Sequence, residues 1–214
     1  MEQTEKTILP IFTTNYDRVL TVAVEGLGYE LVDGFKNERR RRFFNPETYQ
    51  NGKPKEMHLF HLHGAINWRR TKDGRIEWLT TGERVSKSSK IYSENVLIPL
   101  GSHQYPYEEP FKTCHDYLRT YLEKAKICII VGYTFRNEPI NFIFKEALKG
   151  NKNLNLIRIA PDKGVLDSIF PEATSLWENP MRFGENETLE YLWKQFGEIA
   201  VKQMKAKSAQ AKEN

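Results

Sequence analysis

The stretch LFHLHGAINW, residues 59–68, decides the fold. Its first half is a short apolar run of the kind that forms a buried strand, and the run stops at His63 and Gly64. Open α/β folds bind their ligands at the carboxyl ends of parallel strands, so a strand that ends here offers an imidazole to a ligand. His63 is therefore the first candidate functional residue, and a structural histidine in the core is the alternative.

The rest of the chain alternates between strand and helix patterns. Strands are predicted at 7–13, 29–32, 57–62, 95–100, 126–131 and 154–159, and helices at 18–26, 110–125, 138–149, 164–170 and 187–205. In the segment 126–131, residues 127–131 are all apolar, which predicts a central strand buried on both faces. This order of elements predicts an α/β fold with a largely parallel sheet flanked by helices.

One interruption of that pattern is a predicted β-hairpin. Asp73-Gly74 separates two short segments, 66–70 and 75–79, and this dipeptide readily adopts the positive φ angles of a tight turn. Trp68 and Trp78 should then lie close together across the hairpin. We expect it to be a small insertion into the α/β fold.

Length and charge narrow the class of protein. The chain has 214 residues, of which 39% are hydrophobic and 28% charged, and this suits one globular domain. Its net charge of +4 permits an anionic ligand but does not require nucleic acid. The four arginines Arg39–Arg42 could contact phosphates, although a solvated loop or a contact to a neighbour is favoured. Nucleic acid is therefore not expected as a partner.

The number and spacing of cysteines and histidines indicate the cellular compartment and whether a metal site is present. Cys114 and Cys128 are too few for a disulfide framework or a zinc ribbon, and the first ten residues lack a signal-peptide pattern, so we expect a cytoplasmic protein without a membrane span. His61 and His63 alternate along a strand in a spacing that can bind zinc, but His58 has the opposite parity. No metal site is predicted.

Polar turns follow two other predicted strands. Thr14-Asn15-Tyr16-Asp17 follows the first strand, and Gly132-Tyr133-Thr134 follows the run 126–131. In a parallel sheet these turns could share an edge with His63 and line one crevice. For Asn15 and Asp17 the alternative is a structural one, because either could cap the helix that follows.

Four segments taken together resemble the sirtuin-like (SIR2-like) domain of bacterial defence NAD hydrolases. These segments are IFTTNYDRVL at 11–20, LHGAINW at 62–68, YEEPF at 107–111 and IIVGYTFRNEPIN at 129–141. Any one of them is a weak signal, whereas four in order are specific. The resemblance implies a Rossmann-like fold whose substrate is NAD and whose reaction breaks the nicotinamide–ribose bond in antiviral defence.

The resemblance also implies roles for particular residues. Asn15 and Asp17 match the asparagine and aspartate that hold the nicotinamide–ribose region and its water, and His63 matches the general base that contacts the ribose hydroxyls. Residues expected to contact the dinucleotide are Thr14, Gly64, Gly132, Tyr133 and Thr134. Without zinc-ribbon cysteines or an acyl-lysine module, hydrolysis of NAD is expected rather than protein deacylation.

One departure from the family concerns the amino terminus. The family's first strand and its Gly-Ala-Gly phosphate loop should precede Ile11, where this chain has no glycine. We therefore expect a single sirtuin-like domain at 1–205 with a flexible tail at 206–214, missing its phosphate-loop unit, and NAD hydrolysis if that loop is supplied. The alternative is an impaired nucleotide-binding or assembly domain, or a fragment of a larger protein. A homo-oligomer or a partner protein is possible in either case.

Overall fold

The computed structural model describes residues 9–50, 52–53, 56–79, 92–98, 107–173, 176–179 and 194. The chain divides into two compact units, Met1–Leu118 and Arg119–Asn214, and each is treated by itself. That residues 1–205 form a single domain stays a prediction. Apart from position 194, which is helical, the predicted last helix and the predicted tail lie outside the described residues.

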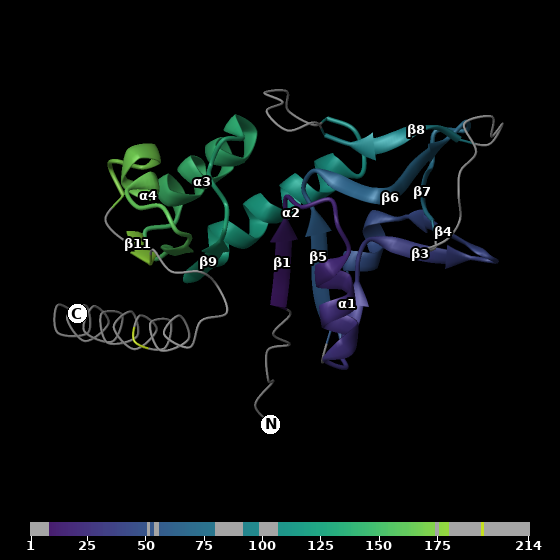
Figure 1. The fold of residues 1–214 in the computed structure, drawn as a ribbon, viewed down its shortest axis with the longest axis horizontal. Coiled ribbons are helices and arrows are strands. Elements are labelled where there is room, and N and C mark those ends of the chain that lie inside the picture. The colour runs from purple at the N-terminus through teal and green to yellow at the C-terminus, as the bar shows by residue number, and fades with distance from the viewer. Residues whose placement is uncertain are drawn as a thin grey trace, which may run out of the picture. The chain divides into compact units, whose positions relative to one another are not determined.

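The first unit contains a small parallel sheet with the order β1-β5-β2. Its strands are β1 (Leu9–Thr13), β2 (Glu30–Val32) and β5 (Glu56–His61), and helix α1 (Val19–Gly26) connects β1 to β2. Figure 1 shows β1 and β5 side by side with α1 next to them. The register pairs Thr13 with His61, so the carboxyl ends of β1 and β5 lie at the same level.

An antiparallel sheet of order β3-β4-β7-β6-β8 completes this unit. It consists of β3 (Phe35–Glu38), β4 (Arg41–Phe44), β6 (Gly64–Thr71), β7 (Ile76–Trp78) and β8 (Tyr92–Leu97), and the 3-10 helix η1 (Pro46–Tyr49) follows β4. The predicted hairpin is confirmed as β6 and β7, where Trp68 lies directly opposite Trp78. It is the middle of a larger sheet, because β3, β4 and β8 pair around it.

The interpretation of Arg39–Arg42 as a solvated loop is wrong for half of the run. Arg39 and Arg40 are exposed at the β3–β4 turn, but Arg41 and Arg42 belong to β4. Arg41 pairs with Glu77, and the Arg42 guanidinium lies 2.7 Å from the Asp33 carboxylate and 4.6 Å above the Trp78 ring. Arg41 and Arg42 therefore stabilise the sheet through contacts with other residues of the same chain.

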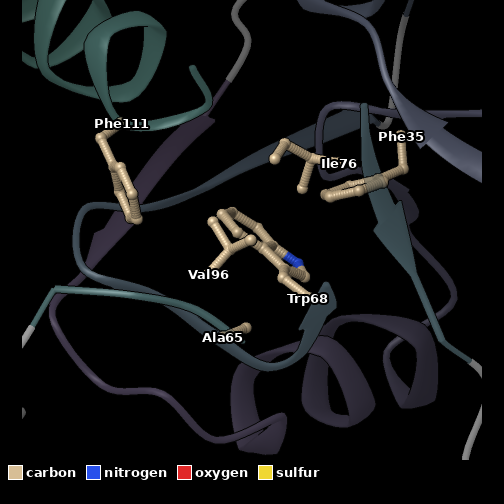
Figure 2. Packing of buried hydrophobic residues seen from close by; sticks show 6 residues of the cluster. All are labelled: Phe35, Ala65, Trp68, Ile76, Val96 and Phe111. Atoms are coloured by element: carbon tan, nitrogen blue, oxygen red, sulfur yellow. The ribbon is translucent and has the colours of Figure 1, made fainter. Parts of the chain in front are cut away.

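Below the antiparallel sheet lies an apolar core that fixes the start of β6. Figure 2 shows its six residues, with the Trp68 indole among them: Phe35, Ala65, Trp68, Ile76, Val96 and Phe111. Trp68 is 2% exposed, and its ring centroid is 5.1 Å from that of Phe35. Because burial of an indole of this size stabilises the fold by a few kcal/mol, at about 25 cal/mol per Å², the chain leaving Gly64 is held firmly.

The second unit is a parallel sheet of order β11-β10-β9. Helix α2 (Phe111–Lys124) crosses the boundary between the units, and then come β9 (Ile127–Val131), α3 (Glu138–Gly150), β10 (Asn155–Ile159), α4 (Val165–Ile169) and β11 (Leu176–Asn179). The helix predicted at 138–149 is confirmed as α3, and its apolar face is buried through Ile140, Ile143, Phe144 and Ala147. Parallel strands flanked by helices confirm the α/β class.

The prediction of β9 as a central strand buried on both faces is wrong. In the sheet of the second unit β9 is an edge strand, and Ile129 and Val131 are 43% and 46% exposed. The central strand is β10, in which every residue is buried. Of the helices that the structure describes, none has the length and apolar character needed to cross a lipid bilayer.

Candidate functional site

The carboxyl ends of β1 and β5 bring two of the predicted polar turns together. Beyond the paired residues Thr13 and His61, the Leu62 amide donates to the Thr13 carbonyl at 2.8 Å. The Ile66 amide then donates to the Tyr16 carbonyl at 3.0 Å. The turn after β1 and the turn after β5 are thus joined through their backbones.

Gly64 sets the path of the chain at the second of these turns. Its φ angle is +83°, and a Cβ atom at this position would lie 2.1 Å from the Val96 carbonyl oxygen. Glycine adopts a positive φ at no steric cost, and it alone can lie this close to a neighbouring backbone. This close approach lets the chain leave β5 and enter β6 beside β8.

His63 lies directly before that glycine and is 4% exposed. Its carbonyl accepts a hydrogen bond from the Ile98 amide at 2.9 Å, so its backbone is fixed. Neither ring nitrogen forms a hydrogen bond of regular geometry with a described residue. Burial lowers the pKa of His63, and the nearby Thr14 carbonyl opposes this only in part. The imidazole is therefore neutral at pH 7 and can accept a proton.

Tyr16 is the aromatic neighbour of His63, with ring centroids 6.4 Å apart. Its hydroxyl donates to the Ile98 carbonyl, and burial raises the pKa of the phenol. Since Ile98 also donates to the His63 carbonyl, one residue of the chain after β8 is bonded to both turns. Sequence reasoning passed over Tyr16, although its place between Asn15 and Asp17 pointed to this edge of the sheet.

His61, the last residue of β5, contacts the turn after β1 directly. Its Nδ1 lies 3.2 Å from the Asn15 carbonyl oxygen, and its ring centroid is 5.5 Å from that of Trp68. Burial lowers the pKa of His61, whereas the Asn15 carbonyl and the Asp17 charge act in the opposite direction. Among the described residues no group of three or more His, Cys, Asp or Glu side chains is arranged to bind a metal ion.

The side chains of Asn15 and Asp17 are exposed. Asp17 Oδ1 accepts a hydrogen bond from the Val19 amide, the first of α1, at 2.8 Å, but the N-cap of this helix is Arg18 and not Asp17. The Asn15 amide donates to Thr13 Oγ1 at 3.1 Å. The contact from Asn15 to β5 runs through its carbonyl to His61, not through its carboxamide to His63.

The third predicted turn belongs to the second unit. Gly132 has a φ angle of +64°, and its amide donates to the Ile159 carbonyl at 2.9 Å. The Tyr133 carbonyl accepts from Arg158 Nε at 3.0 Å, and burial raises the pKa of the Tyr133 phenol. Thr134 is exposed. The turn is ordered within its own unit, and its convergence with Asn15, Asp17 and His63 stays a prediction.

Two buried residues that support these turns were missed. The His115 Nε2 lies 3.2 Å from the Leu62 carbonyl oxygen, although the sequence suggested no partner for this histidine. Its position four residues after Phe111, on the apolar face of α2, was the available signal. Arg158 is 0% exposed, and the available signal was an arginine between the apolar strand residues Ile157 and Ile159.

A family model described as the SIR2-like domain matches residues 10–179. The chain belongs to the SIR2-like domain family. The match includes all eight predicted site residues of this SIR2-like chain, in both units.

Solved structures with a similar fold include two Sir2 homologues, both described as mutants in complex with ADP-ribose. The first is 17% identical, with a TM-score of 0.42, and the match covers 69% of this chain and 55% of that one. The second is 16% identical, with a TM-score of 0.40 and coverages of 72% and 58%. The SIR2-like chain thus spans little more than half the length of these homologues. A comparison with curated proteins gave no match.

Proposed function

We propose that this SIR2-like chain is an NAD glycohydrolase that breaks the bond between nicotinamide and ribose. The observation that supports this most is the pairing of β1 with β5. It places the Thr14–Asp17 turn beside a buried, neutral His63 in a chain that belongs to this family. Consumption of NAD in the cytoplasm would serve antiviral defence, and a homo-oligomer or a partner protein would control it.

The site residues fit the substrate chemically. His63 has two buried ring nitrogens without a regular hydrogen bond to a described residue, which suits contact with a ribose hydroxyl. Thr14 lies next to the imidazole, and the Gly64 backbone passes close to its neighbours without a side chain. In the second unit, the backbone of Gly132, Tyr133 and Thr134 would contact the dinucleotide.

The reaction needs one water and no metal ion. As the glycosidic bond breaks, its electron pair leaves with nicotinamide and positive charge develops at the ribose carbon. Oxygens of Asn15 and Asp17 would stabilise that charge and orient the water. His63 would accept a proton from the ribose hydroxyl region, and the products are nicotinamide, ADP-ribose and one proton. General base catalysis of this kind contributes about 10²- to 10⁴-fold.

Nicotinamide release from NAD by the full chain tests the proposal. We expect turnover by the wild-type protein and a loss of about 10²-fold or more in His63→Ala. Thermal unfolding of both proteins shows that the rates refer to folded molecules. Equal rates for the variant and the wild type would contradict the assignment of His63.

A second candidate is a domain that binds a nucleotide or assembles with a partner without catalysis. It is favoured by the Asp17 carboxylate, which already accepts a hydrogen bond from the Val19 amide at the start of α1. Calorimetry with NAD and with ADP-ribose separates the two candidates, since binding without nicotinamide release favours the second. No binding of either nucleotide would leave only an assembly role.

A further inference from the structure

His115 is a buried histidine outside every motif of the proposed site. It lies in α2, is 4% exposed, and places Nε2 3.2 Å from the Leu62 carbonyl oxygen. A carbonyl oxygen only accepts, so Nε2 carries the proton and donates it. The bonded carbonyl belongs to the peptide group that joins Leu62 to His63.

Two neighbours of His115 on α2 contact the same turn. The backbone amide of His61 donates toward the Cys114 sulfur, and Cys114 is completely buried. The Phe111 ring lies 3.2 Å from the point that a Cβ on Gly64 would occupy. The first turns of α2 therefore pack directly on the backbone that carries His63, all within the first unit.

Three backbone groups around His63 thus have defined partners. The His61 amide faces Cys114, the Leu62 carbonyl accepts from His115, and the His63 carbonyl accepts from the Ile98 amide. Of these three contacts, the bond to the Leu62 carbonyl fixes the rotation of the peptide plane just before the His63 Cα. That rotation sets the direction of the His63 side chain, because φ of His63 is the next torsion along the chain.

We infer that His115 is a positioning residue that orients the His63 imidazole by holding the Leu62–His63 peptide plane. This role rests on the proposed function, in which His63 is the general base. A base displaced by about 1 Å can lose about 10²-fold in rate, and the effect falls on the chemical step. A histidine that only stabilises the fold would affect the unfolding temperature but not the turnover of folded molecules.

Three variants of the full chain separate these roles. His115→Gln retains an amide donor that can reach the Leu62 carbonyl, and His115→Leu removes the donor. Asp116→Asn is the control, because it changes the next residue, whose side chain is about half exposed and pairs with Lys112. We expect His115→Leu to lower kcat about 10- to 100-fold with KM nearly unchanged. His115→Gln should restore most of kcat, and Asp116→Asn should equal the wild type. Wild-type kcat in folded His115→Leu would overturn the inference.

A second measurement does not depend on turnover. Nuclear magnetic resonance of nitrogen-labelled histidine follows the His63 ring, whose pKa burial holds below the ordinary value of 6.5. We expect His115→Leu to shift the His63 ring signals and to move its pKa toward 6.5, and His115→Gln to leave both in place. Unchanged His63 signals in His115→Leu would overturn the inference even if the wild type does not hydrolyse NAD.

The two measurements also distinguish the two failures. A wild type without nicotinamide release, combined with shifted His63 signals in His115→Leu, would contradict the proposed function and leave the control of the His63 ring by His115 intact. If leucine prevents folding, His115→Asn takes its place, because its donor is too short to reach the Leu62 carbonyl. Wild-type His63 signals in that folded variant would overturn the inference.

Discussion

Among the glycines that the structure describes, Gly64 is the one at which an added Cβ would meet its neighbour most closely. A side chain there must adopt a φ of +83° and would meet the Val96 carbonyl oxygen at 2.1 Å. Gly64→Ala should therefore lower the free energy of unfolding by at least about 3 kcal/mol, because neither backbone can move without breaking the β6–β8 pairing. Denaturant unfolding measures this change.

Gly74 provides the matched control for that substitution. It has a φ of +85°, but no atom lies within 4 Å of the place where a Cβ would be. Gly74→Ala should cost only about 1 kcal/mol, which is the cost of the positive φ itself. Equal losses for the two variants would show that the close approach to Val96 does not determine the turn at His63.

At the scale of elements, Arg158 on β10 joins β9, β11 and the loop after β10. Its guanidinium donates to the Tyr133 carbonyl at 3.0 Å and to the Asp162 carboxylate at 2.7 Å, and it lies 3.5 Å from Glu178. Arg158→Met should lower the free energy of unfolding by about 2 to 4 kcal/mol, because these acceptors lose a buried donor. It should also increase amide exchange at Gly132–Thr134.

Lys149→Met is the control in the same unit, since it removes an ion pair with Glu146 in which both side chains are exposed. Solvent screens such a pair, so unfolding should be unchanged within error. If Arg158→Met had as little effect as Lys149→Met, the arginine would not determine the order of the Gly132–Thr134 turn.

Sequence patterns predicted individual helices and turns better than they predicted which strands or side chains pair with one another. The apolar face of α3 follows from helical spacing, and the hairpin with Trp68 opposite Trp78 follows from Asp73-Gly74. The sequence did not reveal that β9 is an edge strand while β10 is central, because an apolar run does not specify its neighbours. The roles of Arg41 and Arg42 were misread for the same reason. Their ion-pair partners, Glu77 and Asp33, are far away in the sequence or lie outside any recognisable motif.

In the candidate site too, local patterns were predicted and long-range contacts were not. His63 and Gly64 were found because a strand ending in His-Gly is a local signal, and the adjacency of the β1 and β5 ends follows from parallel pairing. A structural role of Asp17 at the start of the helix was anticipated as an alternative, although Arg18 and not Asp17 is the N-cap. The contact of His115 with Leu62 spans 53 positions in the chain, and no local pattern encodes it.

For the whole molecule, three buried histidines make stability depend on pH. Burial lowers the pKa of His58, His61 and His63 below the unfolded value of 6.5. The unfolded chain therefore binds protons first as the pH falls. The stability that these histidines contribute is fully present above about pH 6.5. It is lost as the pH falls from 6.5 toward their lower pKa values in the folded state. We expect a nearly constant melting temperature from pH 7 to 8 and a steep fall toward pH 5.

His58→Phe tests this origin, because His58 is 0% exposed and an aromatic ring can fill its place beside Tyr49 and Phe60. Each titrating histidine contributes at most about 1.4 kcal/mol per pH unit. The variant should show a shallower acid slope, whatever its stability at pH 7. An unchanged slope would assign the acid sensitivity to groups other than His58.

A double-mutant cycle on NAD hydrolysis tests most directly whether the ends of β1 and β5 form one site. Asn15→Ala, His63→Ala and the double variant are compared by kcat/KM, with Asn37→Ala on the exposed edge of β3 as the control. Residues that act together on one ribose give strongly non-additive losses, so the double variant should be little worse than the more severe single variant. Losses that multiply, or no nicotinamide release by the wild type, would contradict the account.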